Sequence, residues 1–172
     1  MSSHDPVNDL LQRIELFLNK HHTISIATMA NQELWSASVF YVSDKELNIY
    51  FISFDQSKHI QGISQNRRVS ATINQDVSEW MQIKGLQLQG SVNKLPEHKC
   101  EAVLNVYRQK FSSIHRLLEL PETEDEKKIA EQFRSISVFR FKPDWIRLLD
   151  NSLGFGSKEE IELKNQTWLI KE

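Results

Sequence analysis

The sequence of 172 residues is poor in cysteine, in charge of one sign and in long apolar runs. Its single cysteine, Cys100, excludes an internal disulfide and fits a reducing compartment. Its 21 Lys and Arg residues and 23 Asp and Glu residues give a formal charge of -2, which provides no long-range attraction to nucleic acid or to an anionic membrane. No apolar run approaches the roughly 20 residues that span a bilayer, and the first residues lack the pattern of a secretory signal. These absences predict a cytoplasmic protein without nucleic-acid or membrane partners.

The composition is that of one folded domain. Hydrophobic residues make up 40% of the chain, too many for a collagen-like, low-complexity or disordered protein, and the length suffices for one core. We expect a single domain over residues 1–156. Residues 157–172 form a charged tail that ends with Thr167-Trp168-Leu169-Ile170, and this tail is expected to add an edge strand or to dock on a partner subunit.

Helical patterns occur at the start and in the second half of the chain. Asp5 is a favourable N-cap and Pro6 a favourable first helical residue, and apolar residues then recur at helical spacing up to Lys20. A second helix is predicted to begin after Pro96, with five apolar residues facing the core. These are Ala102, Val103, Val106, Tyr107 and Phe111. A shorter helix is expected around 114–120, followed by a solvated loop or helix start over 121–128.

Between and after these helices the sequence alternates as strands do. The predicted strands are Thr23–Met29, Leu34–Val42, Glu46–Ser53, Arg68–Asn74, Met81–Leu95 and Ile136–Phe141. Trp145–Leu149 is expected to continue the last of these after a kink at Pro143. The breaks between the first three are short and polar, as in hairpins. In the fifth strand, Gln87 and Gln89 are expected on one face. The pattern predicts an α+β protein, a mostly antiparallel barrel with peripheral helices.

The loop after the third predicted strand is the most informative local feature. Ser53 ends that strand, and Ser57, Lys58 and His59 open a segment with helical character. Hydroxyls, a cation, an imidazole and the amides of a helix N-terminus would together form a cradle for a phosphate. The alternative interpretation is a capped surface helix with an exposed lysine.

Four groups of residues carry a resemblance to known families. Ser57-Lys58-His59 and Asn66-Arg67-Arg68-Val69-Ser70 stand at the spacing of the flavin-binding segment of the pyridoxamine 5′-phosphate oxidase-like split barrels, and the match extends to Gly90-Ser91-Val92. Asp150-Asn151-Ser152-Leu153-Gly154-Phe155-Gly156 resembles the C-terminal signature of the small YhbP-like family. The resemblance covers nearly the whole chain up to about Gly156. It implies an α+β, mostly antiparallel split β-barrel with peripheral helices.

The same resemblance implies a homodimer with flavin mononucleotide (FMN) at the subunit interface. Ser38, Val39 and Phe40 would line the isoalloxazine and the ribityl chain, largely through backbone groups. Ile52 and Ser53 would lie along the ribityl phosphate. The cofactor-binding set that the resemblance implies is therefore Ser38, Val39, Phe40, Ile52, Ser53, Ser57, Lys58 and His59, the last three around the phosphate.

The chain also departs from the oxidase pattern. His59 replaces a second phosphate cation and is only partly charged near neutral pH, while Gly85, Leu149 and Val42 stand where the oxidase has glutamine, tryptophan and lysine. Oxidation of vitamin B6 phosphates is therefore not expected, whereas FMN binding and flavin-dependent oxidation or reduction of an unknown small molecule are. No side chain stands out as a general acid, base or nucleophile, so no catalytic residue is assigned.

Other interpretations remain open. The barrel would bind haem or another ligand if His59 or His115 held iron, or it would be a cofactor-free dimeric interaction module. His21-His22 is expected to cap helix carbonyls rather than to bind a metal. The Gly154-Phe155-Gly156 turn is expected either to close over a ligand or to form a hairpin with a core phenylalanine.

Overall fold

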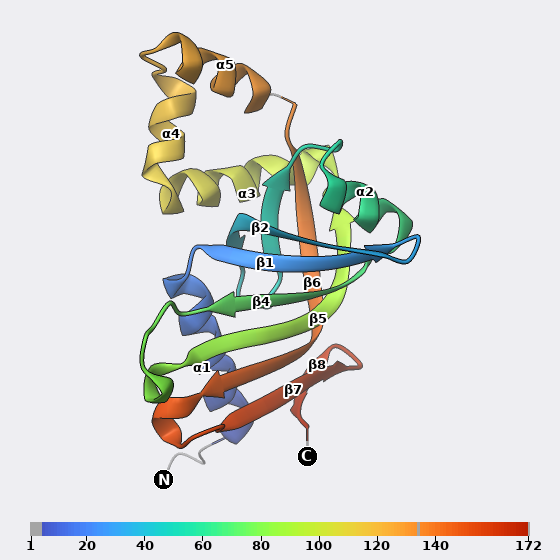
Figure 1. The fold of residues 1–172 in the computed structure, drawn as a ribbon, viewed down its shortest axis with the longest axis vertical. Helices are drawn as coiled ribbons and strands as arrows, with labels where there is room; N and C mark the ends of the chain where they lie inside the picture. Colours follow the sequence, from blue (N-terminus) through green and yellow to red (C-terminus); the bar gives the residue numbers. More distant parts are fainter. Residues whose placement is uncertain (1–4, 134, 172) are drawn as a thin grey trace.

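The structure is a computed structural model that describes residues 5–133 and 135–171. The helices are α1 (Pro6–Lys20), α2 (Lys58–Gln65), α3 (Glu97–Lys110), α4 (Ser112–Glu119) and α5 (Glu124–Phe133), with short 3-10 helices η1 (Trp80–Gln82) and η2 (Asn151–Leu153). The strands are β1 (Thr23–Ala30), β2 (Glu33–Ser43), β3 (Ile49–Ser53), β4 (Arg68–Asn74), β5 (Lys84–Lys94), β6 (Ser137–Asp150), β7 (Lys158–Lys164) and β8 (Thr167–Ile170). In Figure 1, α3, α4 and α5 extend from one end of the sheet, and we call them the helical arm.

The eight strands form one antiparallel sheet in the order β3-β2-β1-β4-β5-β6-β7-β8, and pairing of β3 with β6 closes β1 to β6 into a barrel. The barrel is split along β6, because the two parts of this strand pair with different neighbours. Its first part, Ser137–Phe141, pairs with β3, whereas its second part, Trp145–Leu149, pairs with β7. The structure thus confirms the predicted α+β split barrel with peripheral helices.

The segments before and after Pro143 form one continuous strand, β6, as predicted. Its register with β5 shifts between Gln89 and Gly90, opposite Pro143, so the proline lies at an irregularity where a ladder hydrogen bond is dispensable. A Cβ atom at Gly90 would collide with the carbonyl oxygen of Lys142. The bulge that turns β6 from β3 towards β7 therefore requires glycine at this position.

The core fills the barrel and continues onto α1. The N-terminal cap is as predicted, because the Asp5 side chain accepts a hydrogen bond from the backbone N–H of Val7. The apolar stripe of α1 is buried in the same cluster as the inward residues of the strands. Its buried members are Leu10, Ile14, Phe17 and Leu18. Burial of each such side chain contributes about 1.5–3 kcal/mol, and Tyr41 ties the end of α1 to β2 by donating its hydroxyl to Leu18 O at 2.8 Å.

Two predicted strands begin later than expected. β3 starts at Ile49 rather than Glu46, because the Asp44 carboxylate accepts the backbone N–H groups of Glu46 and Asn48 and holds a turn in which Leu47 has a φ of 64°. The segment before β5 is the 3-10 helix η1, so Met81 belongs to a turn.

The second predicted helix is right in position and wrong in its buried face. α3 buries Tyr107, and Phe111 follows it into the same cluster. Ala102 and Val106 are exposed, because α3 projects from the barrel and only its last turns meet β2. Residues 121–128 contain both the expected loop and the first turn of α5.

The tail contributes β7 and β8, which extend the sheet beyond β6. β8 forms the edge, and its Trp168 packs against the main core cluster while Leu169 and Ile170 remain exposed. No helix in the part of the chain that the structure describes is both long enough and apolar enough to cross a membrane.

Candidate functional site

The loop from β3 into α2 brings three of the predicted phosphate residues together. Ser53 Oγ lies 2.9 Å from His59 Nε2 and 3.3 Å from Ser57 Oγ. Ser53 and His59 are both buried, and burial lowers the pKa of the His59 imidazole. The ring is therefore held in its neutral form, as a hydrogen-bonding partner rather than a charge.

Ser57 is the N-cap residue of α2, with extended backbone dihedrals. Its carbonyl accepts the N–H groups of Ile60 and Gln61, but its hydroxyl makes no capping bond within the described residues. The remaining first-turn amides, those of Lys58 and His59, have no intrahelical acceptor in a helix of this kind. They lie at the helix end that carries Ser57, where the helix dipole favours an anion.

Lys58 lies away from this cluster, beside the β1–β2 hairpin. Its Nζ is 4.4 Å from the centroid of the Trp35 ring and 3.4 Å from Glu33 Oε2, and the side chain is 53% exposed. Together with Gln61 they line a cavity of about 190 Å³. An exposed ion pair of this kind contributes about 0–1 kcal/mol, so the ammonium can leave it for a bound anion at small cost.

The predicted residues of β2 alternate as a strand requires. Val39 packs against the barrel core, while Ser38 and Phe40 point outwards. Ser38 Oγ lies 2.8 Å from Ser25 Oγ of β1. The Phe40 ring is 49% exposed and lies 5.0 Å from the Phe111 ring, centroid to centroid. The outer face of β2 therefore offers a hydroxyl and a flat aromatic surface.

The helical arm is anchored beside these residues. Ile52 of β3 packs against a small cluster of Val42, Tyr107 and Phe111, and the Tyr107 hydroxyl donates a hydrogen bond to the carbonyl oxygen of Phe40. Burial raises the pKa of Tyr107 well above its ordinary value, so this hydroxyl stays protonated as a donor. α3 is thus fixed to the strand that the resemblance assigns to the flavin ring.

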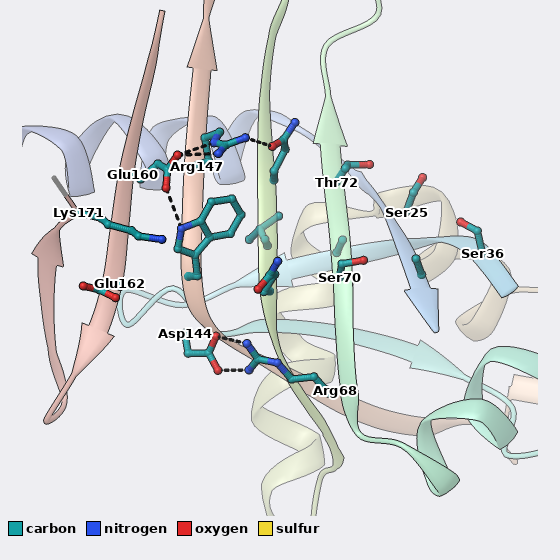
Figure 2. A pocket seen from close by; sticks show the side chains of 16 residues that line it. Ser25, Ser36, Arg68, Ser70, Thr72, Asp144, Arg147, Glu160, Glu162 and Lys171 are labelled. Atoms are coloured by element: carbon teal, nitrogen blue, oxygen red, sulfur yellow. Dashed lines mark hydrogen bonds and ion pairs between the residues drawn. The ribbon is translucent and has the colours of Figure 1, made fainter. Parts of the chain in front are cut away.

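A cleft of about 710 Å³ covers the outer face of the sheet across β1, β2, β4, β5 and β6 (Figure 2). Small hydroxyl side chains line one side of it. They are Ser25, Ser36, Ser70 and Thr72. Gln87 and Gln89 lie on the same face, as predicted, and both line the cleft. Its floor is therefore lined mainly by hydrogen-bonding groups.

The opposite side of the cleft is a network of charged side chains (Figure 2). Arg147 donates to Glu160 Oε1 through Nε at 2.8 Å and to Gln87 Oε1 through Nη1 at 3.0 Å, and Trp145 Nε1 donates to Glu160 Oε2 at 3.1 Å. These bonds, chiefly those from Arg147, lower the pKa of Glu160. Sequence reasoning missed this wall because its members come from three strands and meet only through sheet register.

The Asp150–Gly156 signature forms a tightly bonded turn. Asn151 is buried, donates from Nδ2 to Trp80 O at 2.7 Å and accepts the Gly156 N–H at 3.0 Å. Gly156 has a φ of 75°, which favours glycine. Phe155 at the tip is 74% exposed, with its ring 6.2 Å from that of Trp80. The expectation of a core phenylalanine is wrong.

This turn presents a group of large exposed apolar side chains at the η1–η2 end of the barrel. The group consists of Trp80, Met81, Leu153 and Phe155, which we call the aromatic corner. Gly85 and Leu149, two of the departures from the oxidase pattern, pair nearby across β5 and β6. A Cβ at Gly85 would lie 2.7 Å from Asn74 Oδ1 and 3.0 Å from the carbonyl oxygen of Ile73, so a side chain there would require Asn74 to move.

His21 makes a structural contact at the end of α1. His21 Nδ1 lies 2.8 Å from Phe17 O and its ring stacks on that of Phe17, which confirms the predicted carbonyl cap. The side chain of His115 lies outside the described residues. Within the described residues, no group of three or more His, Cys, Asp and Glu side chains is placed to hold a metal ion.

Two relatives show what the chain is similar to in sequence. A UPF0306 protein of Klebsiella pneumoniae is 28% identical over 151 residues, which cover 87% of this chain and 91% of the relative. The UPF0306 protein YhbP of Escherichia coli O157:H7 is 26% identical over the same length and covers the same shares. No protein-family model matches the chain.

Solved structures show a similar fold at low sequence identity. Campylobacter jejuni ChuZ has a TM-score of 0.70 at 16% identity, over 94% of this chain and 62% of ChuZ. A putative pyridoxamine 5′-phosphate oxidase from Listeria innocua has 0.62 at 15%, over 82% of this chain and 98% of that one. A FAD-binding protein from Mesorhizobium loti has 0.58 at 15%, over 78% and 90%. HutZ, the haem storage protein from Vibrio cholerae, has 0.58 at 17%, over 77% and 88%.

Sequence and structure therefore agree on the resemblance that the motifs indicated. The chain is a relative of the UPF0306 (YhbP) proteins, and it has the split-barrel fold found in pyridoxamine 5′-phosphate oxidase-like proteins.

Proposed function

We propose that this protein is a homodimeric FMN-binding split barrel that binds the cofactor phosphate at the N-terminus of α2. The observation that carries the proposal is the convergence of Ser53, Ser57 and His59 at that helix end. The Ser57 hydroxyl there makes no capping bond to the helix within the described residues. The amides and the helix dipole favour an anion there. Lys58, one residue into the helix, supplies a charge once it leaves Glu33 and Trp35.

The flavin ring would lie on the outer face of β2. Phe40 offers an exposed aromatic surface, and Ser38 offers a hydroxyl two residues away on the same face. Aromatic rings stack favourably on such a surface, and the bond from Tyr107 fixes the backbone of Phe40. When bound, FMN supplies the electron-transfer chemistry, while the chain binds and orients it. A FAD-binding protein with a similar fold supports this assignment.

The homodimer is the second part of the proposal. The aromatic corner exposes Trp80 and Phe155 by 70% and 74% on a turn that hydrogen bonds hold in place. Large exposed apolar groups of this kind mark interaction sites. A second copy of the chain would cover the corner, and sedimentation of wild type against Phe155→Ser would test that contact.

The visible absorbance spectrum of the purified protein, before and after addition of FMN and desalting, tests the cofactor assignment. A retained two-band flavin spectrum near one equivalent per chain is the expected result. A protein that stays colourless after reconstitution would overturn it.

Haem is the second candidate ligand, because HutZ, a haem storage protein, has a similar fold. His59 is poorly placed to hold iron, since it is buried and its Nε2 lies against Ser53 Oγ. The same spectra separate the two ligands. A Soret band that forms on addition of haem and is lost in a histidine variant would favour haem over FMN.

A further inference from the structure

A further cavity, of about 220 Å³, lies between the helical arm and β3 and shares no lining residue with the outer cleft. Its walls are mostly apolar and come from β3, all three arm helices and the segment that leads into β6. They include Ile52, Leu104, Ile114, Leu118, Phe133 and Ile136. We propose that this cavity binds a compact, uncharged apolar molecule of one or two fused rings.

The polar groups of the wall point to an uncharged ligand. The Tyr107 hydroxyl already donates to Phe40 O. The Arg108 guanidinium already donates to Glu101 Oε1 at 2.9 Å and to Asn105 Oδ1 at 2.7 Å. The Tyr107 hydroxyl is thus engaged and the Arg108 charge is paired with the Glu101 carboxylate, so the wall offers a charged ligand no unpaired charge. Burial of a charge without a partner is unfavourable.

The size of the cavity sets the size of the ligand. An apolar cavity of about 150 Å³ stays dry and admits benzene. At about 220 Å³, this one accommodates a bicyclic ring such as indole.

The loose packing of the helical arm favours a bound ligand. No described side chain of α4 or α5 is buried, and the residues that face the cavity are half-buried at most except for Tyr107. An unfilled apolar gap forfeits the contacts that its lining atoms would otherwise make. A ligand in the cavity restores those contacts and joins α4 and α5 to the barrel. Ile52 is shared with the proposed flavin site, but the cavity is formed by protein side chains alone and does not require bound flavin.

The test uses indole as the probe and the isoleucine methyl groups as reporters, in flavin-free protein. Titration of indole into wild type is expected to shift the methyl signals of Ile52, Ile114 and Ile136. Ala130 of α5 lines the cavity, so Ala130→Leu fills it and should weaken indole binding at least about tenfold, the loss of about 1.4 kcal/mol. Ala102→Leu, the same change on the exposed side of α3, is the matched control and should bind like wild type.

Two outcomes would overturn the proposal. One is the absence of methyl shifts at the solubility limit of indole, or equal binding by wild type and Ala130→Leu. The other is an Ala130→Leu protein that changes from dimer to monomer without any indole binding by wild type, which would assign the cavity to a side chain of a second copy. Failure of FMN to bind leaves these readouts unchanged, so it would refute only the proposed function.

Discussion

β5 and β6 at the centre of the sheet differ from α4 and α5 in what holds them in place. β5 and β6 pair from Lys84↔Asp150 to Lys94↔Phe139, and their inward side chains are fully buried in the main core cluster. The two helices have no buried side chain among those described, and exposed ion pairs such as Arg116–Glu126 link them. The barrel therefore fixes the position of the proposed flavin surface, whereas α4 and α5 are held by weaker contacts, which a bound ligand would strengthen.

Truncation of apolar side chains should show the largest difference in stability between the barrel and the outer part of the helical arm. Leu86 of β5 is fully buried, so Leu86→Ala should lower the free energy of unfolding by about 2–5 kcal/mol. Leu118→Ala in α4 should cost less than about half as much, because Leu118 is only half-buried. Urea unfolding curves of the two variants measure both effects. Equal losses would contradict the distinction between the barrel and the arm.

The Asp150–Gly156 turn lies at the surface, but its disruption should still lower the free energy of unfolding. Asn151→Ala leaves the Trp80 carbonyl and the Gly156 N–H without their partner, and should lower the free energy of unfolding by about 1–3 kcal/mol. Asn8→Ala is a control, since Asn8 lies exposed on the first turn of α1 and, among the described residues, its side chain bonds only the N-cap residue Asp5. A loss for Asn151→Ala no larger than that of the control would show that the turn is not rigidly held.

The sequence predicted best what depends on neighbouring residues. The bounds of α1 and β4 match the predictions because a cap, a helical stripe and strict alternation are local signals. The start of β3 was missed because a side chain, Asp44, competes with the strand for backbone N–H groups. The exposure of Val106 was missed because a helical stripe does not reveal how far the helix projects from the barrel.

In the candidate site too, contacts between residues close in sequence were predictable, whereas contacts between distant segments were not. The approach of Ser53, Ser57 and His59 was predictable from their short separation in sequence. The position of Lys58 beside Trp35 was not, because it depends on a hairpin more than twenty residues earlier. The Arg147–Glu160 wall of the cleft depends on the register of β6 with β7, which the sequence does not reveal.

His59 should make the stability of the barrel depend on pH. Burial lowers its pKa below the usual 6.5, so the unfolded chain takes up a proton at a higher pH than the folded protein does. The free energy of unfolding should therefore be constant with respect to His59 above pH 6.5 and fall on acidification from there towards the folded-state pKa. His59→Gln should lose this part of the pH dependence in urea unfolding series. An unchanged profile would contradict the neutral, buried ring.

Loss of the ion pairs of Arg116 in α4 should have the smallest effect on stability. Arg116→Ala removes the contacts with Glu122 and Glu126, which are exposed enough that about 0–1 kcal/mol is expected. Thermal unfolding at low and high salt measures this change. A larger loss would show that the arm is held as firmly as the barrel.

The most direct test of the central claim is the affinity of wild type and Lys58→Ala for FMN and for riboflavin, which lacks the phosphate. A charge-assisted hydrogen bond contributes about 1.5–3 kcal/mol, so Lys58→Ala should bind FMN about 10- to 150-fold more weakly and riboflavin as wild type does. Lys127→Ala, an exposed lysine of α5, should leave both affinities unchanged. Equal FMN affinity in Lys58→Ala and wild type, or an equal loss for riboflavin, would contradict a phosphate cradle at the N-terminus of α2.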